Sequence, residues 1–321
     1  MSMSVPAISV IVPAQSAEAT LARTLAALAD QEVDAIFEVI VVQAGSGPKT
    51  AAIAAAAPLP VRVLEAGPAG PAGPAEARNR GVEQARARLL AFTDADCFPT
   101  RGWLAAGLRA LEGADLVQGS VGPDPDARRG PFDRWVGVGA EVGLYETANL
   151  FVRRSAFECT GGFEAWLRPR IGAPHMAEDV LFGWSVRRSG ARTSFCDEAR
   201  VHHAVFTRRA PGFVGERRRL RYFADIVRAV PELRRSFLFA RTFLSPRTAA
   251  FDLALAGLAL TVSRRSHLAP ALTLPYALAL YRDSRPWGGR APVVALVGAL
   301  ADAVGCYSLL LGSLRRRTPV L

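Results

Sequence analysis

Four short β-rich runs alternate with alanine-rich stretches at the front of the chain, and this alternation constrains the fold more than any other feature. The runs cover residues 7–13, 37–43, 61–65 and 88–93. The stretches between them, at about 17–30, 48–57 and 74–87, have a helical composition. Strands that alternate with helices are typical of βαβ units. We therefore predict an α/β fold with a mostly parallel central sheet.

Polar side chains follow the strands of this predicted sheet. Gln43 ends the second strand and Gly45 follows it, and Asp94 and Asp96 come after the fourth. In open α/β sheets ligands bind beyond the carboxyl ends of the strands, so we expect a nucleotide pocket there. If the strand continues, Asp94 and Asp96 point the same way, and paired carboxylates suit Mg²⁺ or Mn²⁺. The alternative is an acidic turn without a metal.

Several classes of site are excluded by motifs that the sequence lacks. The first strand is followed by Pro13-Ala14-Gln15-Ser16 in place of a dinucleotide-binding glycine motif, and there is no P-loop sequence. The cysteines form no C-x-x-C pair, so neither a zinc site nor a disulfide framework is indicated, and a reducing cytosolic setting fits. They are Cys97, Cys159, Cys196 and Cys306. The apolar run from Val5 lacks a basic segment before it, so we expect a first strand and no signal peptide.

Five segments occur in an order that is typical of one enzyme family. They are Ile8–Ala14 (ISVIVPA), Ala77–Gly81 (ARNRG), Thr93–Asp96 (TDAD), Ala148–Phe163 with its GGF end, and Glu178-Asp179. They resemble the opening strand, the "ARNxG" helix start, the metal motif, the acceptor-side strand and helix, and the "ED" pair of the family 2 inverting glycosyltransferases. The resemblance covers about residues 7–222 and implies a GT-A nucleotide-binding fold.

The resemblance also implies roles for individual residues. Asp96 is the direct metal ligand, Asp94 lies nearer the ribose or a metal-bound water within the same Mn²⁺ or Mg²⁺ site, and Asp179 is the catalytic base. His202 and His203 follow a predicted strand over 195–201, and His203 corresponds to a histidine that completes metal coordination in the family. The expected substrate-binding residues are Pro13, Ala14, Gln43, Gly45, Arg78, Asn79, Asp94, Glu178, Arg218 and Arg221.

Some of these roles have plain structural alternatives. Glu178 and Asp179 lie in the first turn of a helical stretch between Pro174 and Gly190, where the helix dipole favours acids in any protein. That dipole would favour the ionised form of Asp179 and weaken it as a base. Most isolated histidines only satisfy local hydrogen bonds. Arg218 and Arg221 share a helix face that suits a diphosphate, or equally an anionic lipid surface.

The turn after the second strand departs from the family pattern. The family usually has an Asp-Asp-Gly-Ser-like turn there, whereas this chain has Gln43-Ala44-Gly45-Ser46. A glutamine side chain both donates and accepts hydrogen bonds, so it could still contact a base edge with a changed preference. Gln15-Ser16 likewise replaces the usual aromatic-Asn. These changes affect the identity of the donor more than the type of reaction.

The C-terminal part of the chain has a different composition. Residues 200–321 hold 20 of the 39 basic residues and 6 of the 29 acidic ones, interleaved with apolar runs. Residues 292–311 are apolar apart from Asp302 and Ser308, which is about the ~20 residues that a membrane span needs. Shorter apolar runs cover 248–262 and 268–281. We expect a catalytic domain over 1–230 and membrane-associated helices over 231–321; the alternative is buried helices of a soluble domain.

The charge pattern favours an anionic membrane surface over nucleic acid. Arginine clusters at 264–265 and 315–317 place the helix ends on the cytosolic side, where the catalytic domain would also face. Asp252 and Asp302 should then face protein or the lipid surface. A membrane-held enzyme implies a lipid-linked or glycan acceptor, with residues 122–142 lining its side and Trp135 as a candidate sugar platform or a packing residue.

Three functions therefore remain open. The first is metal-dependent, inverting, non-processive transfer of a sugar from a nucleotide-sugar donor to a hydroxyl acceptor at the cytosolic membrane face. The second is a non-catalytic membrane protein that binds a nucleotide sugar or glycan, which the altered Gln43 turn would suit. The third is a sugar nucleotidyltransferase, although the arginine-containing glycine-rich loop of such enzymes does not follow the first strand.

Overall fold

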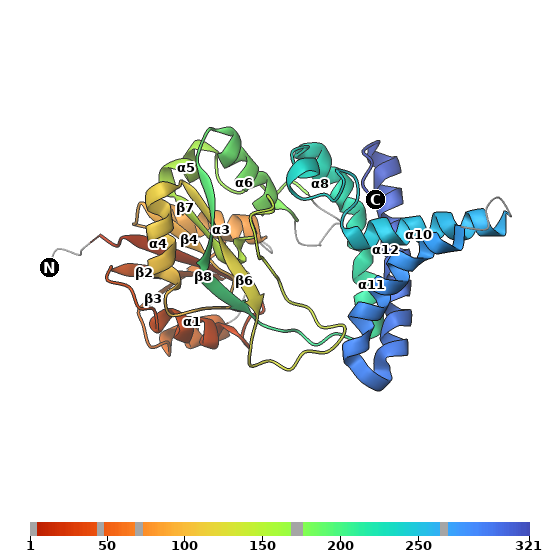
Figure 1. Ribbon diagram of the computed structural model, residues 1–321. Helices are drawn as coiled ribbons and strands as arrows, with labels where there is room; N and C mark the ends of the chain where they lie inside the picture. Colours follow the sequence, from red (N-terminus) through yellow and green to blue (C-terminus); the bar gives the residue numbers. More distant parts are fainter. Residues whose placement is uncertain (1–4, 44–47, 68–72, 168–175, 264–268) are drawn as a thin grey trace. The chain divides into compact units, whose positions relative to one another are not determined.

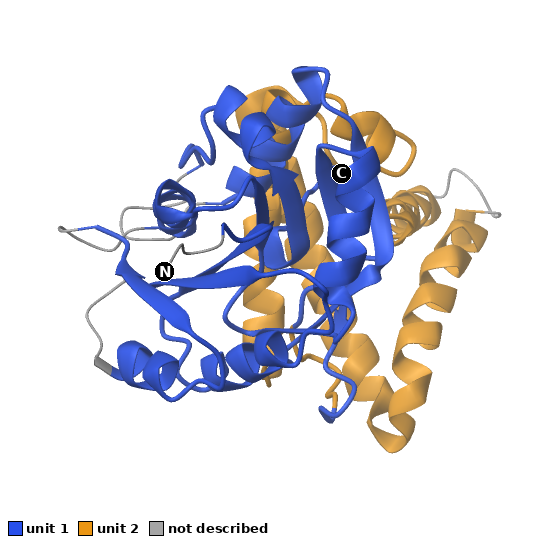
Figure 2. Ribbon diagram, turned by 90° about the vertical axis from the view of Figure 1, so that its left-hand side faces the viewer, with its two compact units in different colours: residues 1–128, 135–205 blue, residues 129–134, 206–321 orange. Residues whose placement is uncertain are grey.

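The computed structural model divides the chain into two compact units, which are described separately (Figure 2). The first unit comprises residues 1–128 and 135–205, and the second comprises 129–134 and 206–321. The residues that the structure describes are 5–43, 48–67, 73–167, 176–263 and 269–321. This division by contacts falls at residues 205 and 206, whereas the domain boundary expected from the sequence lies at residue 230.

One mixed, mostly parallel sheet organises the described part of the first unit, and it confirms the predicted fold class (Figure 1). Its strands run in the order β3-β2-β1-β4-β7-β6-β8-β5. Their bounds are β1 Ile8–Ala14, β2 Phe37–Gln43, β3 Val61–Glu65, β4 Leu89–Phe92, β5 Cys97–Pro99, β6 Leu116–Pro123, β7 Leu150–Arg153 and β8 Thr193–His203. The four strands predicted at the front of the chain are all present, with ends that differ by one residue or less.

The register brings the carboxyl ends of the front strands together, as the sequence predicts. β1 pairs in parallel with β2 and with β4, so that Ala14 lies opposite Gln43 and Ile11 lies opposite Phe92. β7 then inserts antiparallel between β4 and β6, and β8 pairs in parallel with β6. Short β5 pairs antiparallel with the end of β8. These later pairings join segments far apart in the chain, so strand periodicity alone does not predict them.

Helices cover both faces of this sheet. Their bounds are α1 Leu21–Ala29, α2 Pro48–Ala55, α3 Pro74–Gln84, α4 Trp103–Gly113, α5 Arg154–Cys159 and α6 Glu178–Arg188, with the 3₁₀ turn η1 at Thr147–Asn149. Leu21, Leu25 and Leu28 recur at helical spacing on α1, and all three are buried in the core on one face. α3 lies against the opposite face, where a Cβ on Gly81 would stand 2.5 Å from Ile11 Cγ2. The predicted helices are thus confirmed, with α1, α2 and α3 all shorter than expected.

The described part of the second unit is helical. Its elements are α7 Ala210–Glu216, η2 Arg217–Tyr222, α8 Phe223–Ala229, α9 Leu233–Ser236, α10 Pro246–Val262, η3 Ala269–Thr273, α11 Leu274–Ser284, η4 Arg285–Arg290 and α12 Ala291–Arg316. Ser245 and Thr248 form a reciprocal capping box that fixes the start of α10. α12 packs so closely on η2 that a Cβ on Gly312 would stand 2.1 Å from the Arg221 carbonyl oxygen. Helix α12 therefore needs a glycine at this contact.

α12 carries an apolar stripe that the described residues of its own unit leave uncovered. The stripe recurs every three, four or seven residues, which is one face of a helix. It consists of Val293, Leu296, Leu300, Tyr307, Leu310 and Leu314, exposed by between 46% and 72%. The stretch Ala269–Arg316, which is kinked at Gly288, is the one segment among the described residues that is long and apolar enough to cross a membrane. This finding rests on length and composition alone.

The acidic residue within α12 is paired inside the unit. Arg247 Nη2 lies 2.7 Å from Asp302 Oδ2, and the Tyr276 hydroxyl donates to the same oxygen at 2.8 Å. These partners come from α10 and α11, so the three long helices meet at this polar cluster. The sequence predicts that Asp302 faces protein or the lipid surface. In the structure it faces protein, and Arg247 balances its charge.

Candidate active site

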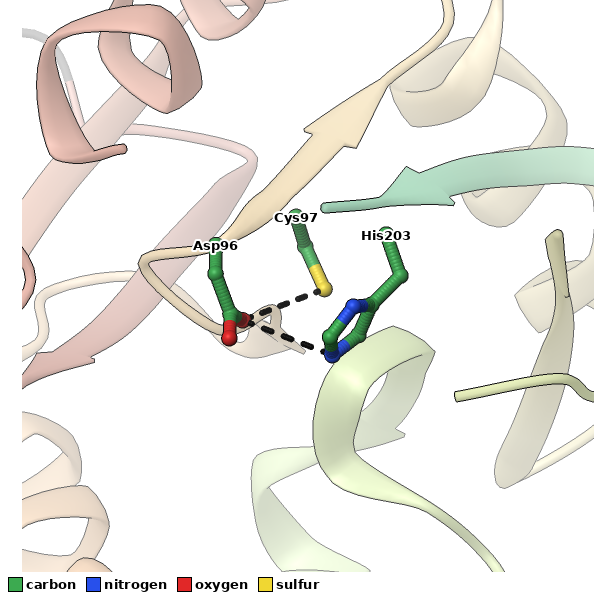
Figure 3. Close-up of side chains that lie close together, drawn as sticks. All are labelled: Asp96, Cys97 and His203. Atoms are coloured by element: carbon green, nitrogen blue, oxygen red, sulfur yellow. Dashed lines mark hydrogen bonds and ion pairs between the residues drawn. The ribbon is translucent and has the colours of Figure 1, made fainter. Parts of the chain in front are cut away.

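Three side chains with metal-binding atoms meet where β5 pairs with β8. They are Asp96, Cys97 and His203, and Figure 3 shows that they point toward one another. Cys97 lies directly opposite His203 in the antiparallel register, which places the two side chains on the same face. Their ligand atoms all lie within 4.8 Å of one another. A divalent ion bonded at roughly 2.0–2.5 Å to each atom would need about this spacing.

The His203 ring presents its Nε2 atom toward Asp96. Nδ1 lies 2.7 Å from the Ala204 carbonyl oxygen, which only accepts, so Nδ1 carries the proton. Nε2 lies 3.7 Å from Asp96 Oδ1. A divalent cation between these two residues could take one ligand atom from each. A ligating histidine with its other nitrogen bonded to a backbone carbonyl is the usual arrangement in metal sites, so these residues fit a divalent ion.

His203 is buried, at 4% exposure, and β8 contains both adjacent histidines. Successive strand side chains point to opposite faces, so only one of the two can face the cluster. The strand predicted over 195–201 is confirmed and extends to include them. Of the pair, His203 is the one that faces Asp96, as the sequence analysis expects.

Asp94 and Asp96 have separate surroundings. β4 ends at Phe92, and the Cys97 amide donates to the Asp94 carbonyl oxygen at 3.0 Å, so both aspartates lie in a turn. The strand alternation that would point them the same way therefore does not apply. Asp94 Oδ1 accepts from Arg78 Nη2 at 2.9 Å, whereas Asp96 faces Cys97 and His203. Among the described residues, the group with metal-binding spacing includes Asp96 and leaves Asp94 outside.

Arg78 joins the aspartate turn to the start of α6. Its side chain is buried, and its Nη1 group lies 3.0 Å from Glu178 Oε1 while Nη2 bonds Asp94. Arg78 therefore links Asp94 to Glu178, and all three are residues that the sequence analysis expects to bind substrate. The charge of Arg78 is committed to these two carboxylates, so its main physical effect is to position them.

Asp179 follows Glu178 and has a raised pKa. Burial and the nearby Glu178 and Glu146 carboxylates raise the pKa of Asp179 well above its usual range, while Arg78 opposes the shift. The helix dipole alone would act the other way, so the sequence-based expectation of a weakened base is wrong: burial and like charge outweigh the dipole. Ala177, the residue directly before α6, has a left-handed φ of 59°. A carboxylate with a raised pKa accepts a proton more readily.

Glu146 is a residue of this site that the sequence analysis missed. It directly precedes η1, and burial raises its pKa as well. The amide of Asn149 donates to the Glu146 carbonyl oxygen at 3.2 Å, which fixes the turn that carries it. In the sequence, the one indication of this role is that Glu146 lies three residues before Asn149. Its contribution to the charge around Asp179 depends on tertiary packing.

Asn79 bonds the backbone of the GGF turn. Its side chain donates to the Phe163 carbonyl oxygen at 2.8 Å and accepts from the Phe163 amide at 3.0 Å. Gly162 has a φ of +78°, and a Cβ there would meet the Asn79 side chain at 2.8 Å. Asn79 thus connects α3 to the acceptor-side segment and fixes the GGF turn.

The remaining expected residues lie in three places. Pro13, Ala14 and Gln43 end β1 and β2 at the same sheet edge, with Ala14 and Gln43 buried. Gly45 lies outside the described residues. Arg218 is exposed in η2 of the second unit, and Arg221 Nη2 there bonds the Tyr222 hydroxyl at 3.1 Å. Trp135, the candidate sugar platform, is 36% exposed in the first unit.

Comparison of the sequence with known proteins finds similarity to glycosyltransferases. Residues 9–165, about half of the chain, match the model of glycosyl transferase family 2. The chain is 31% identical over 175 residues to glycosyltransferase AglE of Haloferax volcanii, covering 51% of this chain and 58% of that protein. It is 29% identical over 145 residues to the pre-mycofactocin glycosyltransferase of Mycobacterium tuberculosis, covering 40% of this chain and 29% of that one. The match thus spans less than two thirds of either relative.

Solved structures share the fold. The mannosyltransferase PcManGT from Pyrobaculum calidifontis, in complex with GDP-Man and Mn²⁺, aligns with a TM-score of 0.61 at 22% identity, over 92% of this chain and 88% of that chain. TarS 1-349 from S. aureus, in complex with UDP-GlcNAc, aligns with a TM-score of 0.50 at 19% identity, over 97% and 92%. At these identities the likeness shows a GT-A-type fold.

Proposed function

Because the chain belongs to glycosyl transferase family 2, we propose that it performs metal-dependent, inverting transfer of a sugar from a nucleotide-sugar donor to a hydroxyl acceptor. One observation carries the proposal: His203 Nε2, the Asp96 carboxylate and the Cys97 thiol face one another within 4.8 Å, which is a spacing that ligands of one divalent cation have. The salt-bridged residues Asp94, Arg78 and Glu178 connect the adjacent turn to Asp179.

Each of these residues has a distinct part in the proposed reaction. Asp96 and His203 would hold Mn²⁺ or Mg²⁺. A divalent ion there would neutralise the charge that builds on the leaving diphosphate. Asp179 takes the proton of the acceptor hydroxyl, and its raised pKa suits it to that step. An acceptor that attacks opposite the leaving group inverts the anomeric centre.

Donor binding is proposed at the edge where β1 and β2 end. Pro13, Ala14, Gln43 and Gly45 would line the nucleotide, and Asp94 would contact the ribose or a metal-bound water. The two hydrogen bonds of Asn79 and the two ion pairs of Arg78 support a positioning role for both, in place of direct contact with substrate. The donors in the two solved structures, GDP-Man and UDP-GlcNAc, define the first candidates to test.

We further propose that the second unit associates with the cytosolic face of a membrane and that the acceptor is lipid-linked or part of a cell-envelope glycan. The uncovered stripe of α12 and the length of the stretch Ala269–Arg316 support membrane association. The excess of arginine in this part of the chain favours anionic lipid. Arg218 and Arg221 would then contact phosphate groups of anionic lipid.

The test is release of nucleoside diphosphate from UDP-, GDP- and dTDP-sugars, with Mn²⁺ or Mg²⁺ and with membranes as the source of acceptor. We expect metal-dependent release from one donor by the wild type and loss of release in Asp96→Ala. Asp34→Ala is the matched control, because Asp34 is exposed and lies outside the proposed site. Nucleotide binding without release from any donor would overturn the proposal in favour of a non-catalytic protein, and pyrophosphate formation would indicate a nucleotidyltransferase.

A further inference from the structure

The thiol of Cys97 lies in the same cluster as the two proposed metal ligands. Its Sγ is 3.9 Å from Asp96 Oδ1 and within 4.8 Å of the His203 ligand nitrogen. Figure 3 shows the thiol directed toward the same space as the carboxylate and the imidazole. Cys97 is fully buried, and its backbone is fixed by the pairing of β5 with β8. The thiol thus has a fixed position beside the proposed ion.

We propose that Cys97 is a third protein ligand of the metal, so that the site binds its ion through one oxygen, one nitrogen and one sulfur atom. The inference rests on the metal site of the proposed function, and it does not depend on which sugar is transferred. On binding, the S–H proton leaves to solvent and the thiolate bonds the ion, with no change of oxidation state. Positions on the ion beyond these three remain for diphosphate oxygens.

A sulfur ligand changes which metals the site prefers. Mg²⁺ requires oxygen ligands in near-octahedral geometry, whereas thiolate suits softer ions such as Co²⁺ and Zn²⁺. The carboxylate and the thiolate together supply two negative charges, which balance one divalent ion. The site would therefore bind Mn²⁺, Co²⁺ or Zn²⁺ in preference to Mg²⁺, and removal of the sulfur would reduce that preference.

The alternative is that Cys97 only packs in the hydrophobic core, since its neighbours include core residues of the sheet. A packing role and a ligand role differ in one measurable property. A ligand thiolate gives Co²⁺ a charge-transfer absorption in the near ultraviolet, and a packing thiol gives none. This signature needs no substrate and no turnover.

The experiment titrates the full chain in detergent with CoCl₂, alone and with GDP or UDP, for wild type, Asp96→Ala, Cys97→Ser and Cys196→Ser. Cys196 is half-buried in the same strand as His203 but lies outside the cluster, so it is the matched control. We expect the charge-transfer band in wild type and Cys196→Ser and its loss in Cys97→Ser. Co²⁺ affinity in Cys97→Ser should fall about tenfold or more, with Mg²⁺ competing better.

A second variant leaves Cys97 untouched in case its substitution impairs folding. In the variant Cys159→Ser, Cys196→Ser, Cys306→Ser, the only cysteine is Cys97. Zinc X-ray absorption of this variant should show a sulfur neighbour at about 2.3 Å. A shell of oxygen and nitrogen alone, or a Co²⁺ spectrum that Cys97→Ser leaves unchanged, would overturn the inference.

The outcomes separate this inference from the proposed function. If Co²⁺ binding requires Asp96 but lacks the thiolate band, the metal site stands and Cys97 is not a ligand. If the band is present and depends on Cys97 but no donor releases nucleoside diphosphate, the ligand assignment stands and the proposed transfer fails.

Discussion

At the scale of single residues, the charge around Asp179 is unusual. Its neighbours Glu178 and Glu146 are both acidic, and the cation that reaches this group, Arg78, is already paired with Glu178 and Asp94. Burial is the largest cause of the raised pKa of Asp179, and the Glu178 and Glu146 carboxylates add to it. A raised pKa suits the proposed role of Asp179 as a base, whereas ionisation of this buried carboxyl is unfavourable for the folded protein.

Substitution of Asp179 with Asn should separate these two effects. A folded-state pKa above the unfolded value gives stability at low pH that is lost as pH rises through the folded pKa, so above the unfolded-state pKa the Asp179 carboxyl costs folding free energy. Asp179→Asn should lower sugar transfer by about 10²–10⁴-fold and raise the thermal midpoint. Nucleoside diphosphate release and thermal unfolding at neutral pH measure the activity and the stability, with Asp34→Asn as the exposed control. A lower midpoint would contradict the assigned pKa direction.

Glu146 should tune the pH dependence of the reaction. Because Asp179 must be ionised to accept a proton, kcat/KM should rise with pH through the pKa of Asp179. Glu146→Gln removes a neighbouring negative charge and lowers that pKa, so the acid limb should move to lower pH. The measurement is a pH profile of kcat/KM for wild type and variant. An unmoved limb would show that Glu146 does not act on Asp179.

At the scale of elements, α3 holds the site together through consecutive residues. Arg78 joins it to the aspartate turn and to α6, and Asn79 joins it to the GGF turn. Gly81 one turn later lets the helix lie against β1. The ARNRG segment is therefore a structural junction, which explains why a motif without an obvious nucleophile or metal ligand lies beside the site.

Removal of the Arg78 charge should destabilise the protein. Arg78→Met leaves the buried Glu178 carboxylate without its cation, and breaking a buried pair costs about 3–5 kcal/mol. The control is Arg80→Met on the same helix, where the exposed pair with Glu83 contributes about 1 kcal/mol or less. Denaturant unfolding measures both. Equal stabilities with a loss of activity only in Arg78→Met would instead indicate that Arg78 acts on substrate.

At the scale of the whole molecule, the two units differ in surface chemistry. The first buries its apolar strands between helices, whereas the second leaves the α12 stripe exposed. α12 has 26 residues, which corresponds to about 39 Å at 1.5 Å per residue and exceeds the ~30 Å hydrocarbon thickness of a bilayer. Its length and its stripe both suit contact with lipid.

Membrane association should depend on this stripe. Leu296→Glu with Leu300→Glu places two charges on it, at residues exposed by 72% and 55%, so binding to anionic liposomes should fall strongly while the interior of the unit is unchanged. Ile36→Glu, at a residue 57% exposed in the first unit, should bind as wild type does. Liposome flotation measures the bound fraction. A wild-type chain that stays soluble after detergent-free lysis and a high-salt wash would contradict membrane association.

The sequence by itself determined the local parts of this protein. Runs of apolar residues predicted β1 to β4 and their helices, because period and composition act within a few residues of chain. Motif order indicated Asp96, His203 and Asp179 as site residues before any contact was known. The apolar C-terminal segment was equally visible, because an uninterrupted apolar length needs no partner to be recognised.

Only the tertiary structure decided which side chains meet. Cys97 reaches His203 because β5 pairs with β8, and Glu146 acts on Asp179 because the turn before β7 packs near α6. The side chains of Asp94 and Asp96 have different surroundings, since Arg78 binds Asp94. Contacts of this kind join distant segments, and the pKa of a buried group depends on every charge around it. Neither is contained in a local pattern, so the chemistry of the site follows from the packing.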